Sequence, residues 1–141
     1  MRALFLFLAL LVGRAEAQQP VLLQNAYPIS AIPITASATG TTGATTATLA
    51  ANANRQTWIC GFSILANATA AATGAATVTG TVTGTLNFTQ FTAPLASGIG
   101  TVSQTFAPCI PSSAINTAIA VVSAAPGAGG TVSVTAWGYQ Q

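Results

Sequence analysis

Few side chains of this 141-residue chain are suited to covalent or acid–base chemistry. Cys60 and Cys109 are its two cysteines, and Arg55 is the single Asp, Glu, Lys, Arg or His residue after Gln18. General acid–base catalysis requires a group that titrates near neutral pH, and a Ser or Thr nucleophile requires a base beside it. Residues 18–141 offer no such group, so we expect no catalytic residue and no enzymatic activity.

The same inventory predicts that the chain binds no metal, no cofactor and no nucleic acid. Metal ions are held by clustered imidazoles, thiolates or carboxylates, and two widely separated cysteines do not provide such a cluster. The glycine-rich motifs of phosphate and dinucleotide binding are absent from the sequence. A single arginine carries far less positive charge than a nucleic-acid interface requires.

The first seventeen residues have the features of an export signal. Arg2 gives a positive start, residues 3–12 form an apolar run, and Ala15-Glu16-Ala17 is the small-x-small pattern that signal peptidases accept. We predict cleavage after Ala17 and an exported product, which would be extracellular, periplasmic or attached to a surface such as that of a virion. A membrane anchor is the alternative, but a spanning helix needs about 20 apolar residues, so we expect no membrane span after cleavage.

Export bears directly on the two cysteines. An exported chain meets an oxidising compartment, and no third cysteine competes for Cys60 or Cys109, so we expect a disulfide between them. A bridge that closes a loop of roughly 50 residues would stabilise the fold by about 4 kcal/mol on the chain-entropy model. Two separate buried thiols are the alternative.

Aromatic residues and the lone arginine are the candidates for a contact surface. Trp137 and Tyr139, together with Tyr27, could form a platform for a sugar or for another protein chain. Aromatic residues in a last strand also commonly cover the core or anchor a subunit contact. Arg55 could be an exposed residue at the turn before the next strand, or it could pair with the α-carboxylate of Gln141 within a subunit or across a contact.

A row of alternating threonines is the third candidate, and its members are Thr77, Thr79, Thr81, Thr83 and Thr85. The alternation predicts one strand that carries these hydroxyl groups on a single face and continues to about Phe91. The row resembles the Thr-x-Thr arrays of ice-binding proteins, which order water. An ordinary solvent-facing strand has the same pattern.

Residues 55–65 are expected to form the central, mostly buried strand. Strict alternation places its larger side chains on one side and the others on the opposite side; the first set is Trp58, Cys60, Phe62 and Ile64, and the second is Ile59, Gly61, Ser63 and Leu65. In residues 131–139 the same rule puts Trp137 and Tyr139 on the face opposite Val132, Val134 and Ala136. Pro28 and Pro33 should confine the first strand to a sheet edge.

The chain contains about seven or eight such short strands, separated by turn signals, and no convincing helix. This pattern predicts an all-β fold, either an antiparallel sandwich or a jelly roll. The expected organisation is a signal peptide at 1–17, an N-terminal arm at 18–28 and a single β-sandwich domain at 29–141.

Three short stretches resemble those of small uncharacterised proteins encoded in bacterial and phage genomes, some of them associated with virions. The stretches are Trp58-Ile-Cys-Gly-Phe, Pro108-Cys-Ile-Pro and Trp137-Gly-Tyr-Gln. The likeness covers nearly all of the mature chain. It implies a compact β-domain that serves as a surface or capsid-decorating module.

These features favour a non-enzymatic structural protein that is exported, self-associates and forms or decorates a surface assembly of a virion or a cell envelope. We expect a homo-oligomer or a larger assembly, because the sheet edges lack the charged residues that usually prevent an edge strand from pairing with another chain. The alternative is a secreted module that binds carbohydrate or another surface ligand.

Overall fold

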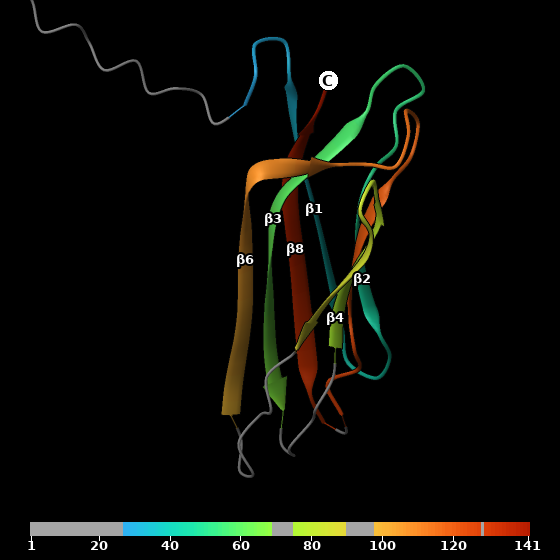
Figure 1. The fold of residues 1–141 in the computed structure, drawn as a ribbon. Coiled ribbons are helices and arrows are strands. Elements are labelled where there is room, and N and C mark those ends of the chain that lie inside the picture. Colours follow the sequence, from blue (N-terminus) through green and yellow to red (C-terminus); the bar gives the residue numbers. More distant parts are fainter. Residues whose placement is uncertain (1–26, 69–74, 90–97, 128) are drawn as a thin grey trace, which may run out of the picture.

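The computed structural model describes residues 27–68, 75–89, 98–127 and 129–141 (Figure 1). Within these ranges the chain forms eight β-strands and no helix. The strands are β1 Ile32–Gly40, β2 Thr45–Leu49, β3 Thr57–Ala68, β4 Ala75–Thr81, β5 Gly84–Thr89, β6 Gly98–Pro111, β7 Ile119–Ser123 and β8 Thr131–Gln140. The predicted signal peptide, its cleavage point at Ala17 and all but the last two residues of the predicted arm lie outside the described residues.

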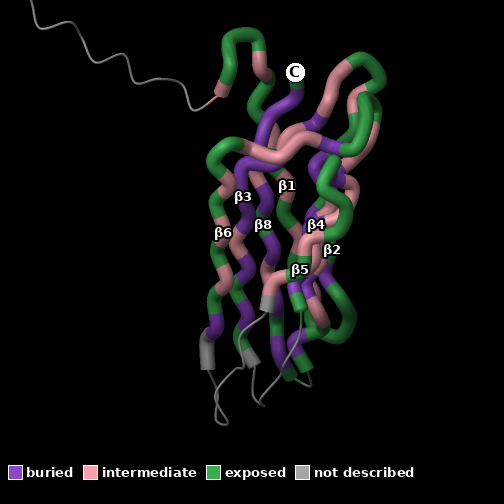
Figure 2. The backbone as a smooth tube through the Cα atoms, viewed as in Figure 1, coloured by how far each residue is buried: buried purple, intermediate pink, exposed green. Residues whose placement is uncertain are grey.

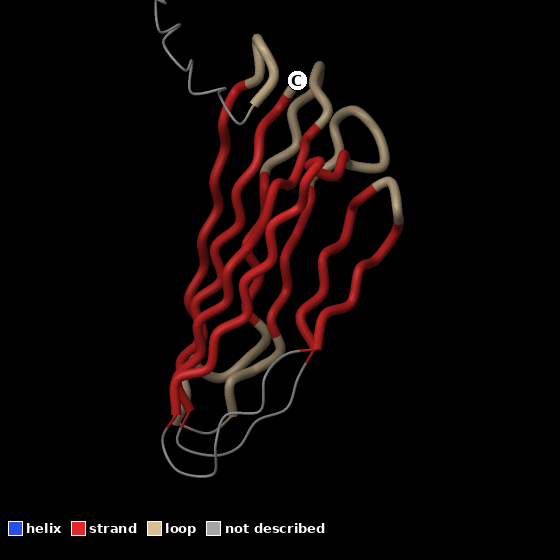
Figure 3. The backbone as a smooth tube through the Cα atoms, turned by 60° about the vertical axis from the view of Figure 1, so that its left-hand side comes forward, coloured by secondary structure: helices blue, strands red, loops and turns tan. Residues whose placement is uncertain are grey.

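The strands form two four-stranded antiparallel sheets that pack against each other. One sheet has the order β1-β8-β3-β6, and the other has the order β2-β7-β4-β5. Figure 3 shows the strands (red) running along a common direction, with most loops (tan) at the two ends of the sandwich. The arrangement confirms the predicted all-β antiparallel sandwich.

The core lies between the sheets and follows the alternation in the sequence. In β8, Val132, Val134 and Ala136 are fully buried, whereas Trp137 lies on the opposite face and is only partly buried (Figure 2). The other strands contribute inward residues in the same way, namely Ala47, Leu49, Phe62, Ile64, Val78, Ile119 and Val121. Burial of these branched and aromatic side chains is the main force that holds the sheets together.

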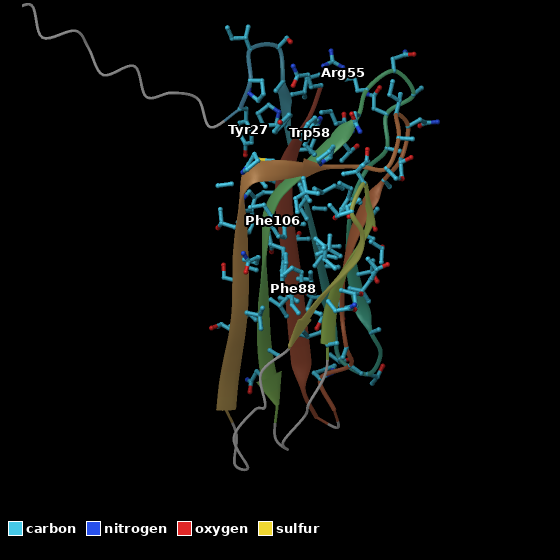
Figure 4. All side chains as sticks on the ribbon, in the orientation of Figure 1. Tyr27, Arg55, Trp58, Phe88 and Phe106 are labelled. Atoms are coloured by element: carbon cyan, nitrogen blue, oxygen red, sulfur yellow. A yellow bond between two sulfur atoms is a disulfide. The ribbon has the colours of Figure 1, made fainter. Side chains whose placement is uncertain are left out.

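Three phenylalanine rings close the core on the side of β5 and β6. The ring of Phe62 on β3 lies 5.1 Å from that of Phe88 on β5 and 6.2 Å from that of Phe106 on β6, measured between centroids. The Phe88 and Phe106 centroids are 6.1 Å apart (Figure 4). Because β5 belongs to one sheet and β6 to the other, these rings join the two sheets along this side.

The predicted distribution of side chains in β3 is partly wrong, because the strand contains a β-bulge. The pairing of β3 with both neighbours shifts register between Ile59 and Gly61. Strict alternation placed Trp58, and not Ile59, on the side of Phe62. The bulge reverses this assignment, because Ile59 is fully buried in the core with Phe62 while Trp58 is only partly buried. A one-residue shift exchanges the faces of a strand, and a bulge is such a shift.

The prediction that the threonine row forms one strand is wrong. The chain turns back in a hairpin, which leaves Thr77, Thr79 and Thr81 on β4, Thr83 in the turn and Thr85 on β5. Gly80 and Gly84 both have a φ of 84°, a conformation that glycine adopts without steric penalty. The Thr81 side chain is buried, and its hydroxyl donates to the carbonyl oxygen of Gly84. The row therefore presents no continuous hydroxyl array.

β1 and β6 are the two edges of their sheet. The edge position of β1 is the one predicted from Pro28 and Pro33. β6 pairs with β3 from Gly98 to Thr105, bends to cross one end of the sandwich (Figure 1, orange), and pairs with β3 again at Ile110 and Pro111. Cys109 lies in the bent part and is bonded to Cys60, which confirms the predicted disulfide.

Candidate functional site

An aromatic stack is formed by Tyr27, Trp58 and Tyr139. It lies at the C-terminal end of β8, since Tyr139 is the last residue but one of that strand, and Figure 1 marks the C-terminus at this end of the sandwich. Trp58 and Tyr139 are partners in the β3–β8 ladder, and their rings are nearly parallel, with centroids 5.6 Å apart and an interplanar angle of 9°. Tyr27 meets Tyr139 edge-on at 5.5 Å (Figure 4). Only 6% of Tyr139 is exposed, so it is the covered centre of this stack.

The environment of Tyr139 also affects its ionisation. Burial raises the pKa of the Tyr139 phenol above its ordinary value of 10.0, because the phenolate would lose contact with water. Tyr139 is therefore uncharged at neutral pH. Sequence reasoning named Tyr27 and Tyr139 but missed Trp58, because the bulge that turns Trp58 toward them has no obvious signal in the local pattern.

A network of buried polar groups supports the same end. The Ser112 amide donates to the Thr57 carbonyl oxygen at 2.7 Å, and the Ser112 hydroxyl accepts from the Thr57 amide at 3.3 Å. The Thr57 hydroxyl and the Gln140 side-chain amide both donate to the carbonyl oxygen of Ala50, at 3.0 and 2.7 Å. Because these bonds join β3 and β8 to the loops around them, they hold the end of the sandwich in one arrangement.

Exposed aliphatic side chains cover this end, and we call them the end surface. They are Ile29, Ile32, Val82 and Ile115, with exposed fractions of 96%, 46%, 58% and 61%. Backbone hydrogen bonds link two of their segments to this end, since the amide of Val82 donates to the Pro111 carbonyl oxygen and that of Asn116 donates to the Arg55 carbonyl oxygen. The third segment, which contains Ile29 and Ile32, is linked to it by the Arg55 guanidinium, which donates to the Ser30 carbonyl oxygen. The end surface is therefore carried by three segments that the fold brings together.

Arg55 lies within this end and is partly exposed. Its amide closes the preceding turn by donating to the Asn52 carbonyl oxygen at 3.2 Å, and its guanidinium donates to the Ser30 carbonyl oxygen at 3.3 Å. Among the described residues it forms no ion pair, so the alternative in which it binds the carboxylate of Gln141 within the same subunit is not realised. Its position agrees with the other alternative, in which Arg55 lies at the turn before the next strand.

Trp137 is not part of the aromatic stack, although it lies two residues from Tyr139 on the same strand. On the outer face of its sheet it is flanked by Thr35 of β1 and Gly61 of β3. Its indole lies across Gly61, where a Cβ atom would collide with the ring and would also come within 2.6 Å of the Gln104 carbonyl oxygen. The predicted platform of Trp137, Tyr139 and Tyr27 is therefore divided into a mostly covered stack and a separate, partly exposed indole.

Short hydroxyl side chains extend from the level of this indole along four adjacent strands, in the direction away from the aromatic stack, and we call the area the hydroxyl face. Its members are Thr35, Ser37 and Thr39 on β1, Thr131, Ser133 and Thr135 on β8, Ser63 on β3, and Thr101, Ser103 and Thr105 on β6. Each of these residues has a neighbour in its strand that faces the core or packs against it. Leu65 of β3 lies in the same face, between Ser133 and Thr101, and is 48% exposed. Sequence reasoning missed this face, because its strands are not consecutive and only the strand order places them side by side.

The described residues contain no group of three or more His, Cys, Asp or Glu side chains that could hold a metal ion. They also include no helix that is long and apolar enough to cross a bilayer. The described surface presents aliphatic, aromatic and hydroxyl groups for noncovalent contacts. Comparison of the chain with protein-family models, with curated proteins and with solved structures found no match.

Proposed function

We propose that this protein is a non-enzymatic structural module, which is exported, self-associates and forms or decorates a surface assembly on a virion or a cell envelope. The observation that carries the proposal is the end surface, where Ile29, Ile32, Val82 and Ile115 are all about half exposed or more. Exposed aliphatic groups at one end of a domain favour contact with another surface, because their contact with water is unfavourable. The disulfide is compatible with the oxidising compartment that export implies.

Charge and sheet edges support self-association in particular. Residues 18–141 contain one charged side chain, Arg55. Two copies can therefore come into contact with little cost for the desolvation of charged groups. β6 is the longest strand and lies at an edge, and it contains no lysine or other charged residue that would discourage pairing with a second chain.

We also propose that the sandwich is a jelly roll. Its antiparallel pairs include β1 with β8, β2 with β7, β3 with β6 and β4 with β5. These are the pairs expected when one long eight-stranded hairpin is rolled into two sheets. Jelly rolls occur in capsid domains and in lectin domains, so this topology is compatible with an assembly role and with a glycan-binding role without selecting one.

Sedimentation velocity of the processed protein over a wide concentration range tests self-association. We expect reversible association that changes little with salt, because charges contribute little to it. The double variant Ile29→Ser/Ile115→Ser should associate at least tenfold more weakly, since each buried isoleucine is worth about 1.5–3 kcal/mol. Leu65→Ser is the matched control, because Leu65 is 48% exposed but lies on the outer side of the β1-β8-β3-β6 sheet, in register with Ser133 and Thr101 and outside the end surface.

Two results would contradict the proposal. A wild-type protein that stays monomeric at the highest concentration it reaches would exclude self-association. An oligomer that the double variant leaves unchanged would show that the end surface is not the contact.

The carbohydrate-binding alternative has its own supporting observation, the partly exposed indole of Trp137.

A further inference from the structure

We propose that the hydroxyl face is a binding platform for a neutral polysaccharide, with Trp137 at the end of the face that adjoins the aromatic stack. This inference refines the carbohydrate-binding alternative and is independent of the end surface. It assigns the platform to the outer side of β1-β8-β3-β6 and removes Tyr27 and Tyr139 from it, because Tyr139 is covered within the aromatic stack.

The position of the indole is set by the glycine beside it. Because Gly61 has no side chain, the Trp137 ring can lie directly across the β3 backbone. Any larger residue at position 61 would collide with the ring. One side of the ring rests on the sheet while the residue remains partly exposed. A ring supported in this way loses little conformational freedom when a ligand stacks on it, which favours binding.

The neighbours of the indole leave its surroundings open. In the adjacent row, Ser37 of β1, Thr135 of β8, Ser63 of β3 and Ser103 of β6 lie side by side in register. Serine and threonine are short, so they do not rise above an indole ring, and each hydroxyl both donates and accepts hydrogen bonds. Such a face suits a ligand that offers many hydroxyl groups and an apolar ring surface, as a pyranose does.

The spacing and the charge of the face select the kind of ligand. Rows repeat about every 6.7 Å along a strand and about 4.8 Å between strands, so an extended chain can touch several rows at once. The face contains no charged side chain. An acidic polysaccharide bound there would therefore have no partners for its charges. A neutral polysaccharide meets both conditions.

The test measures retention of the processed protein on microcrystalline cellulose, chitin and starch granules, with alginate beads as the acidic comparison. We expect retention on at least one neutral polymer and none on alginate. Trp137→Ala should weaken the association constant about tenfold or more, which corresponds to about 1.4 kcal/mol. Thr135→Glu should weaken the association constant to a similar degree, because it places a charge on the hydroxyl face. This second variant tests the proposal even if Trp137→Ala does not fold.

Thr46→Glu is the matched control, because Thr46 is an exposed threonine on β2 in the other sheet. It should leave retention within about twofold of the wild type. Failure of the wild type to bind any of the three neutral polymers would overturn the inference, as would equal retention of Thr135→Glu and Thr46→Glu. Loss of self-association in Trp137→Ala with unchanged retention would also overturn it, and would assign the hydroxyl face to contacts between copies.

Discussion

Cys60 is bonded to Cys109 at the position where the pairing of β3 with β6 is interrupted. On one side of the bridge Ile59 pairs with Ile110, and on the other side Gly61 pairs with Thr105. The backbone hydrogen bonds that normally hold an edge strand are thus broken at the bend of β6. The disulfide connects the two strands there instead.

Removal of this bridge should destabilise the fold. In Cys60→Ala/Cys109→Ala the unfolded chain regains the freedom of a loop spanning 49 positions, so the free energy of unfolding should fall by about 2–4 kcal/mol. Urea denaturation measures the change. Addition of a reductant should destabilise the wild type and leave the double variant unaffected; equal stability of the two proteins under oxidising conditions would contradict the prediction.

Ser112→Ala should lower the free energy of unfolding by about 1–3 kcal/mol. The Ser112 hydroxyl accepts from the Thr57 amide at 3.3 Å and donates to the Ala114 carbonyl oxygen at 2.8 Å, and Ser112 is fully buried. Ser113→Ala is the control, because Ser113 is exposed, and it should change stability by less than about 0.5 kcal/mol. Similar denaturation midpoints for the two variants would show that the polar network contributes little.

Thr45→Val should leave stability unchanged or raise it by about 1 kcal/mol. Among the described residues, the Thr45 hydroxyl is the buried side-chain oxygen that has no hydrogen-bond partner. Thr57→Val is the matched comparison, because the buried Thr57 hydroxyl donates to the Ala50 carbonyl oxygen at 3.0 Å, and it should be destabilising. Thermal unfolding of both variants measures the difference, and a larger loss in Thr45→Val would refute the assignment.

The pH dependence of stability should be flat from acid to mildly alkaline pH and should fall above about pH 10. Residues 18–141 contain no Asp, Glu, His or Lys, so the side chains that usually cause acid unfolding are missing. The pKa of Tyr139 is raised above 10.0 in the folded state, so above that pH the unfolded state releases its proton first and is favoured. Denaturation between pH 3 and 11 tests both parts, and in Tyr139→Phe the alkaline decrease should be smaller.

The sequence was sufficient wherever the strands are regular. The alternation in β8 correctly placed Val132, Val134 and Ala136 in the core and Trp137 on the other face, because β8 pairs with both neighbours along its length. The disulfide between Cys60 and Cys109 could also be predicted from the sequence, because the N-terminal segment predicts export to an oxidising compartment and no third cysteine competes.

The errors occurred where the backbone departs from regular alternation. At the β3 bulge, one added residue moved Ile59 into the core and Trp58 out of it. In the threonine row, two glycines with positive φ allowed a hairpin where the side-chain pattern indicated a continuous strand. Neither departure changes the hydrophobic period of its segment enough to be read from the residues alone.

By itself the sequence determined that the fold is all-β and that residues 18–141 act almost without charge, because both properties follow from local period and composition. Only the tertiary structure decided which aromatic rings stack, which aliphatic side chains gather at one end and which hydroxyl rows lie side by side. These relationships depend on pairing between strands far apart in the chain, such as β1 with β8, and such pairing is set by packing of the whole core.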